Sequence, residues 1–181
     1  MKAVKPKIRY ERRLGSWVAP LPTIDPFIVL RSAADLEEYG PKFQYGHYVR
    51  VRSLPRLVGG LGAVGGLVMG AQVKPIRNWL YGLRQPGQGP DAAKRERSNF
   101  SVIFFGEAED GRRAVVEVSG GDPGYGETSK MLAESALCLV HDRSSLAERY
   151  GVRTPASALG SVLLERLKAA GMGFEVVDRP E

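Results

Sequence analysis

The sequence predicts an α+β domain with a mixed or antiparallel sheet and helices on one face. Three observations predict this class: several short apolar or alternating runs typical of strands, two long amphipathic patterns typical of helices, and a chain of 181 residues. Runs of strands followed by helices favour this class over a parallel α/β sheet. The chain is also too short for both a dinucleotide-binding domain of roughly 150 residues and a full substrate domain.

The first third of the chain contains two strand-like runs. Residues 26–31 (PFIVLR) form an apolar run that predicts a short strand. Ser32 and Asp35 match a capping box, which predicts a short helix that ends at Gly40. Apolar and polar side chains alternate between residues 43 and 52, as in a half-buried strand. His47 lies on the apolar face of this strand, where a core or wall residue is more usual than a catalyst.

Residues 57–73 carry no charge and include six glycines. They contain a G-x-G-x-x-G match at 60–65, but no acidic residue follows about 20 positions later and the glycines recur beyond the motif, so we expect no dinucleotide site there. The run is shorter than the ~20 apolar residues of a membrane-spanning helix. Two interpretations stay open: a small-residue helix packed inside the protein, or a mobile apolar lid or membrane-surface segment over residues 57–84.

The remaining elements have stronger local signals. Residues 85–90 predict a loop, and residues 94–97 predict a solvated helical turn. Strands at 100–107 and 113–119 are joined across Asp110–Gly111, which predicts a hairpin. A final strand is predicted at 174–177.

Two helices are predicted in the last third of the chain. The first covers residues 127–141 and includes Cys138, which we expect to be a buried, inert thiol. The second begins after Thr154–Pro155 and ends at Gly171. The residues that we expect to point inward from the first helix are Met131, Leu132, Ala136, Leu137 and Val140.

Basic charge is concentrated near the N-terminus. Residues 1–13 hold six Lys and Arg against Glu11 alone, whereas the remaining residues hold 20 basic and 19 acidic side chains. The sequence has no signature of a nucleic-acid-binding motif, so we expect no nucleic-acid partner. One cysteine excludes a disulfide framework, and neither histidine has a Cys or His at metal-ligand spacing, so we expect no metal site.

The densest group of candidate functional residues joins the hairpin to the following helix. Glycine lets the backbone approach a ligand there, and the amides at a helix start can hold an anion or polarise a carbonyl. Tyr125 is the candidate catalytic residue, as a proton donor or a stacking wall. The alternative is a purely structural strand-to-helix turn that needs Gly and Pro. The candidate substrate-binding residues are Ser119, Gly120, Gly121, Asp122, Gly124 and Thr128, together with His47.

Several motifs in combination resemble a known family. They are residues 22–26 (PTIDP), 45–48 (YGHY) and 118–125 (VSGGDPGY), followed by Thr128, residues 130–137 (KMLAESAL) and Thr154–Pro155. From about Tyr10 onward the chain resembles the second half of the saccharopine dehydrogenase-like oxidoreductases, and within them the actinobacterial trans-acting enoyl reductases.

The resemblance implies an NAD(P)H-dependent reductase whose N-terminal Rossmann domain binds the nucleotide, while the C-terminal domain supplies the substrate wall and the subunit interface. It also implies an acyl substrate of polyketide type, held on a carrier protein, in the synthesis of complex cell-wall lipids. The hydride would pass from the nicotinamide to the β-carbon of an enoyl thioester.

No position here matches the Rossmann glycines of that family. We therefore expect residues 1–13 to be the end of a missing nucleotide-binding domain and residues 14–181 to be a substrate and dimerisation domain. We then expect the cofactor, NAD(P)H, to be bound outside this chain. We also expect a homodimer, located in the cytoplasm or peripherally at the plasma membrane. Two alternatives stay open: a non-catalytic lipid- or membrane-associated module, and an inactive truncated fragment.

Overall fold

The computed structural model describes residues 1–83, 87 and 89–177, which divide into two compact units. Unit 1 contains residues 1–2, 27–44 and those from 91 onward, and unit 2 contains residues 3–26 and 45–90. Three residues of the predicted loop at 85–90, Gln85, Pro86 and Gln88, lie outside the described residues.

Unit 1 is built on a three-stranded antiparallel sheet with the order β6–β7–β8. The strands are β6 (Phe100–Glu107), β7 (Arg113–Gly120) and β8 (Gly173–Val176). The predicted hairpin is confirmed, since β6 and β7 pair along their whole length and Gly111 takes the positive φ of 84° that its turn requires. The predicted final strand is also confirmed, as β8.

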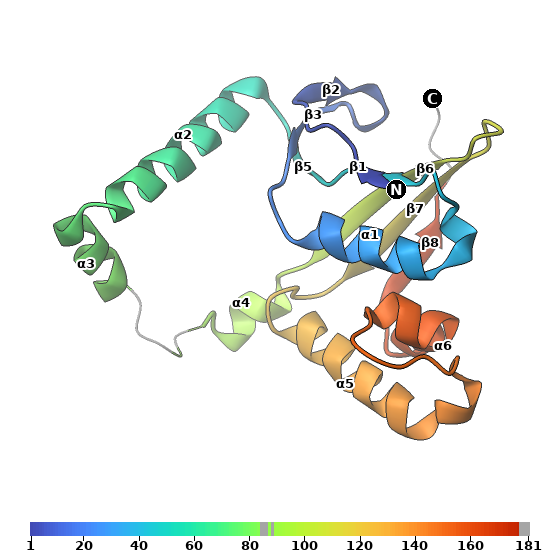
Figure 1. Cartoon of the computed structure of the whole chain (residues 1–181). Coiled ribbons are helices and arrows are strands. Elements are labelled where there is room, and N and C mark those ends of the chain that lie inside the picture. The colour runs from blue at the N-terminus through green and yellow to red at the C-terminus, as the bar shows by residue number, and fades with distance from the viewer. Residues whose placement is uncertain (84–86, 88, 178–181) are drawn as a thin grey trace. The chain divides into compact units, whose positions relative to one another are not determined.

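Two helices cover one face of this sheet (Figure 1), which confirms the predicted α+β class. They are α5 (Gly126–His141) and α6 (Pro155–Ala169). Thr154 begins α6 as predicted, because its Oγ1 accepts a hydrogen bond from the Ser157 amide at 3.3 Å. A short helix, α4 (Ala92–Glu96), precedes the sheet and begins at Asp91. The core between helices and sheet consists of Cys138, Leu159, Leu163, Leu167 and Met172, with Phe100, Val118 and Phe174 packed against it.

The predicted inward face of α5 is wrong. Leu132 and Val140 are 73% and 72% exposed, and Ala136 and Leu137 are exposed as well. Of the predicted set only Met131 packs against the core, while the buried residues of α5 are Glu127 and Cys138. The buried side of α5 therefore carries a carboxylate and a thiol. Because neither is a large apolar side chain, the most apolar side of the helix in the sequence is not the side that is buried.

The predicted strand at 26–31 is also wrong, because these residues belong to helix α1 (Asp25–Asp35). A short apolar run does not distinguish a strand from a buried helix, and Pro26 in the first turn favours the helix. Ser32 consequently lies inside α1 and caps nothing; its Oγ donates to the carbonyl of Ile28 at 2.9 Å. A 3-10 turn, η2 (Glu37–Tyr39), follows and ends at Gly40, whose φ is 67°.

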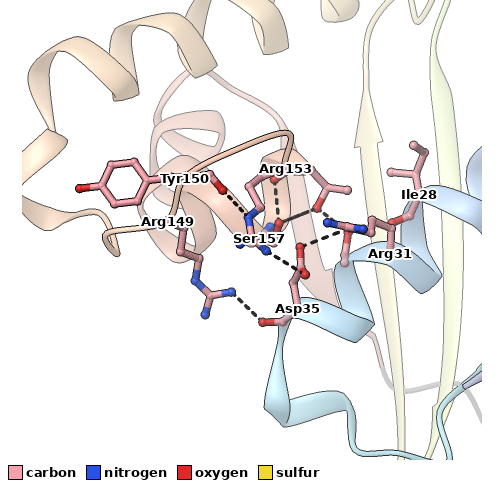
Figure 2. A network of polar contacts seen from close by, with 9 residues as sticks. Ile28, Arg31, Asp35, Arg149, Tyr150, Arg153 and Ser157 are labelled. Atoms are coloured by element: carbon pink, nitrogen blue, oxygen red, sulfur yellow. Dashed lines mark hydrogen bonds and ion pairs between the residues drawn. The ribbon is translucent and has the colours of Figure 1, made fainter.

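Figure 2 shows polar contacts that connect α1 to the start of α6 within unit 1. The hydroxyls of Ser32 and Thr154 are 2.7 Å apart and both are buried. Arg153 forms an ion pair with Asp35 at 2.9 Å, and the Arg149 guanidinium donates to the Asp35 carbonyl at 2.7 Å. The hydrogen bond from Arg153 lowers the pKa of the Asp35 carboxyl. These hydrogen bonds and this ion pair connect α1 to the start of α6.

Unit 2 contains a second antiparallel sheet with the order β2–β3–β5. The strands are β2 (Arg9–Glu11), β3 (Ser16–Pro20) and β5 (Tyr48–Val51), and a 3-10 turn, η1 (Arg12–Leu14), joins the first two. Arg50 braces that turn by donating to Ser16 Oγ and to the Leu14 carbonyl, both at 3.0 Å. The predicted strand at 43–52 is interrupted, since β4 (Gln44–Tyr45), which pairs with β1 (Lys2–Ala3), is separate from β5.

The glycine-rich run forms a helix, α2 (Leu54–Ala71), which is followed by α3 (Lys74–Gly82). By length and composition α2 could cross a membrane. Only Leu57 of α2 is buried, so within unit 2 the run does not form an interior helix. A Cβ added at Gly59, Gly60, Gly62, Gly65 or Gly66 would meet nothing within 4 Å. The segment is therefore helical, and most of its surface is not covered by the rest of unit 2.

Candidate functional site

The predicted site lies in the connection between β7 and α5, in unit 1. The structure brings Ser119, Gly120, Gly121, Asp122, Gly124, Tyr125 and Thr128 together there, because all of them belong to this one strand-to-helix connection. We refer to residues 119–128 as the β7–α5 turn.

Asp122 organises the turn. Its Oδ2 accepts hydrogen bonds from the amides of Tyr125 and Gly126 at 2.9 and 3.1 Å, and its carbonyl accepts from the Glu127 amide at 2.9 Å. The hydrogen bond from the Gly126 amide is the main cause of the lowered pKa of Asp122. In the described conformation the Asp122 carboxylate already accepts from the amides of Tyr125 and Gly126, so a substrate anion or carbonyl could use these two amides only if Asp122 moved; the expectation that the helix start receives such a group stays a prediction.

Glu127 is a buried anchor that the sequence analysis did not identify. Its side chain is inside unit 1, with the residue only 7% exposed. Its Oε1 accepts from the Gly121 amide at 3.2 Å and from Lys130 Nζ at 2.8 Å. Oε2 is buried without a hydrogen-bond partner among the described residues. The sequence signal was the Gly120–Gly121 pair followed six residues later by a carboxylate, which can reach back to the turn.

Gly120 is the position in the turn where glycine is needed. A Cβ there would lie 2.7 Å from Phe100 Cε1 and 3.1 Å from Glu127 Cδ. The neighbouring Ser119 faces Gly173 of β8 across the sheet, and a Cβ on Gly173 would collide with Ser119 Oγ. The end of β7 is therefore closely packed on both sides, which fixes the position of the turn that follows.

Tyr125 is half exposed, so its phenol ring is accessible at the turn. Its backbone is held by Asp122, and Thr128 stabilises the opposite side of the turn by donating from Oγ1 to the Pro123 carbonyl at 2.6 Å. The turn thus presents an aromatic ring with a hydroxyl from a rigid support. Such a side chain can stack on a ligand or donate a proton to it.

His47 belongs to unit 2 and has different neighbours. Its Nδ1 lies 3.0 Å from the hydroxyl of Tyr45. Burial raises the pKa of Tyr45, and the negative charge of Asp25 raises it further. A hydrogen bond from Thr23 lowers the pKa of Asp25, and the charge of His47 also lowers it. Tyr45 and His47 are therefore hydrogen-bonded in unit 2 with the charge of Asp25 nearby, and of these three residues the sequence analysis named only His47 as a candidate site residue.

The glycine motif at residues 60–65 does not fit a nicotinamide dinucleotide. The G-x-G-x-x-G match at 60–65 lies inside α2, whereas a pyrophosphate site needs these glycines in a turn between a strand and a helix. A Cβ at Gly60, Gly62 or Gly65 would meet open space, so no close approach requires glycine at these positions. Across residues 1–83, 87 and 89–177, no three His, Cys, Asp or Glu side chains are grouped as a metal site requires.

Comparisons with known proteins identify relatives of most of the chain. A candidate trans-acting enoyl reductase of Mycobacterium tuberculosis (strain H37Rv) is 39% identical over 160 residues, which cover 82% of this chain and 38% of the relative. A trans-acting enoyl reductase of Mycobacterium ulcerans is 36% identical over 88 residues, 49% of this chain and 21% of that protein. One from Mycobacterium bovis (strain BCG) is 38% identical over the same number of residues.

These relatives show homology to proteins named as enoyl reductases, which confirms that part of the predicted resemblance. The chain spans less than two fifths of the length of the first relative. No family model matches the sequence, and no solved structure matches it. The wider resemblance to saccharopine dehydrogenase-like proteins stays a prediction.

Proposed function

We propose that this chain is the substrate-binding part of an enoyl reductase-like oxidoreductase that acts on acyl chains of polyketide or lipid type. The observation that carries the proposal is the 39% identity to a candidate trans-acting enoyl reductase over 82% of this chain. Because the chain spans only 38% of that relative, the proposal assigns it one part of the activity and not the whole.

The β7–α5 turn is the proposed substrate contact. Asp122 and Glu127 hold its backbone with hydrogen bonds from four groups: the amides of Tyr125, Gly126 and Gly121, and the Lys130 ammonium. A contact on rigid support loses less entropy on binding than one on a mobile loop. In this proposal Tyr125 contacts the acyl group near its thioester and donates a hydrogen bond or a proton.

The proposed cofactor is a reduced nicotinamide dinucleotide, which supplies hydride when bound. We assign its binding to polypeptide outside this chain, because the glycine motif at 60–65 lies inside a helix. We also propose that the active species is a homodimer or larger assembly in the cytoplasm.

Nuclear magnetic resonance of the whole chain tests the substrate contact. The probes are decenoyl and decanoyl thioesters of N-acetylcysteamine, which carry the unsaturated and saturated acyl groups. We expect both thioesters to change the chemical shifts of the backbone amides of residues 119–128. We expect Tyr125→Ala to weaken binding of both severalfold. Tyr150→Ala is the matched control, because Tyr150 is another exposed tyrosine of unit 1 that lies outside the turn. If neither thioester shifts the turn, the chain does not bind substrate there.

Titration with NADH and NADPH, followed by nicotinamide fluorescence, tests the assignment of the cofactor. We expect no saturable binding at micromolar concentrations. Tight binding of either nucleotide by this chain would overturn the assignment of the cofactor site. It would not affect the proposed substrate contact, which the thioester titration tests separately.

A further inference from the structure

The α2–α3 hairpin, residues 54–83, exposes a large apolar surface. Six large apolar residues of α2 are each more than half exposed: Val58, Leu61, Val64, Leu67, Val68 and Met69. Within unit 2, α2 packs against α3 at Gly70, where a Cβ would lie 3.4 Å from Ile76 Cγ2. Elsewhere along α2 the added Cβ atoms meet nothing. Isolated exposed apolar residues are ordinary in soluble proteins, but a continuous surface of this kind marks an interaction site.

No side of α2 carries a polar side chain after Arg56. Successive residues of a helix are about 100° apart, which puts Leu57, Leu61, Val64 and Val68 along one side. Gly59, Gly62, Ala63, Gly66 and Gly70 lie along the opposite side. A protein partner, or a second copy of this chain, would cover one side of α2 and leave the other side exposed to water. A helix without polar side chains on any side is stable when it is surrounded by a protein core or by lipid.

The next helix, α3, is amphipathic in a way that suits a membrane interface. Ile76, Trp79, Leu80 and Leu83 share one side of the helical wheel, and Lys74, Arg77, Asn78 and Tyr81 share the other. Trp79 and Tyr81 are 64% and 73% exposed. Tryptophan and tyrosine next to basic residues are typical of segments at the headgroup level of a bilayer.

The charge around the hairpin has one sign. No Asp or Glu occurs between Glu38 and Asp91, a span that contains seven Lys and Arg. Arg56 borders the start of the apolar run, and Lys74 borders its end. Each basic side chain near an anionic membrane surface strengthens binding to it.

We propose that the α2–α3 hairpin docks this chain on an anionic lipid bilayer. Embedded in the acyl-chain region, α2 has lipid on all its sides at once; at 18 residues and 1.5 Å per residue it is about 27 Å long. Helix α3 lies at the interface, with Trp79 toward the acyl chains and Arg77 toward the headgroups. This docking is independent of the proposed enoyl reductase function, which involves unit 1.

Flotation with vesicles tests the docking. The probes are vesicles of phosphatidylcholine alone and of phosphatidylcholine mixed with phosphatidylglycerol. We expect the chain to float with the mixed vesicles and to bind the neutral ones more weakly. Replacing Arg56, Lys74 and Arg77 together by Gln is expected to weaken binding to the mixed vesicles about fivefold per residue. Absence of flotation with the mixed vesicles overturns the proposal.

Tryptophan fluorescence locates the docked segment. The chain has two tryptophans, Trp17 in β3 and Trp79 in α3, so Trp17→Phe leaves Trp79 as the only reporter. We expect its emission to shift to the blue on binding and to be quenched by lipids brominated near the headgroup. The reciprocal variant, Trp79→Phe, reports from Trp17 and is expected to show no quenching. Quenching of Trp17 instead of Trp79 overturns the assignment to the hairpin.

A matched pair of variants distinguishes binding through the α2 surface from nonspecific adsorption of exposed apolar residues to lipid. Leu61→Ser with Val64→Ser is expected to reduce flotation at least tenfold. The circular dichroism spectrum of the whole chain is expected to show that the variant is still folded. The control is Leu132→Ser with Val140→Ser, which removes two apolar residues of α5 that are even more exposed and is expected to leave flotation unchanged. Equal loss in both variants contradicts the proposal. Sedimentation without lipid tests the rival occupant, because a dimer abolished only by the α2 variant would assign the hairpin to a second copy of the chain.

Discussion

Gly120→Ala is the sharpest test of the geometry at the end of β7. The Cβ of alanine would lie 2.7 Å from Phe100 Cε1 and 3.1 Å from Glu127 Cδ and Cγ. Phe100 packs against the core, and Glu127 is fixed by its bonds to Gly121 and Lys130, so neither neighbour moves freely. The substitution must therefore shift a core ring or displace the anchor of the turn.

The magnitude follows from two opposing effects. Overpacking a filled site costs about 1–3 kcal/mol. Replacing a strand glycine by alanine stabilises by about 0.5–1 kcal/mol, because the unfolded chain loses freedom. Gly106→Ala in β6 has the second effect without the first, since its Cβ would make an ordinary contact of 3.7 Å with the Ala114 carbonyl. The difference in stability between the two variants, about 1–3 kcal/mol, therefore isolates the steric cost.

The single cysteine supplies an assay confined to unit 1. Cys138 lies in the core of that unit and is fully buried, so a thiol reagent labels it only when the unit opens. Labelling along a urea series gives the unfolding midpoint of each variant. For a chain of this size 1 kcal/mol also corresponds to about 2–4 °C in Tm.

Equal midpoints for Gly120→Ala and Gly106→Ala would refute the reasoning, because they would mean that the added methyl group meets no resistance. A second variant checks the cause. In a Phe100→Leu background the ring edge is absent, so Gly120→Ala is expected to cost clearly less than it does in the natural chain. An unchanged cost would assign the strain to Glu127 instead of Phe100.

Three further predictions use the same labelling assay. Glu127→Ala is expected to destabilise unit 1 by about 1–3 kcal/mol, because the Gly121 amide loses its acceptor, while Glu127→Gln keeps an acceptor and costs less; equal effects would contradict the role of that bond. The lowered pKa of Asp122 means that its contribution is complete above the ordinary carboxyl pKa of about 3.9 and is lost as the pH falls through the folded-state pKa, so Asp122→Asn is expected to flatten the loss of stability in acid. Thr154→Val is expected to cost about 0.5–2 kcal/mol through loss of the cap on α6 and of the contact with Ser32, whereas Thr154→Ser should retain most of the stability.

Elements with strong local signals could be predicted from the sequence. The Asp110–Gly111 turn and the Thr154–Pro155 start of α6 are decided by residues within a few positions, through positive φ and through capping. Residues 26–31 lacked such a signal, because a run of five apolar residues suits either a strand or a helix. The packing partners of α5 also depend on distant segments, which is why a stripe marked by Glu127 and Cys138 was not expected.

The candidate site follows the same division. The turn between β7 and α5 could be predicted, because glycines before a helix start are a local feature. The use of the amides by Asp122 and the burial of Glu127 could not, since both depend on the close packing around Gly120. The association of His47 with Asp25 joins positions 22 residues apart, and only the fold brings their charges together.

The positive net charge of the chain is concentrated in unit 2. The segments of unit 2 contain eleven Lys and Arg against Glu11 and Asp25, while the acidic residues of unit 1 slightly outnumber its basic ones. The basic N-terminal run is thus part of a positively charged unit that also carries the α2–α3 hairpin, and an anionic membrane attracts this unit and not unit 1. Raising the salt concentration screens such attraction, so it should release the chain from anionic vesicles without moving the Cys138 labelling midpoint. A midpoint that moved together with vesicle release would mean that docking and the stability of unit 1 are coupled, contrary to the independence argued from their separate residues.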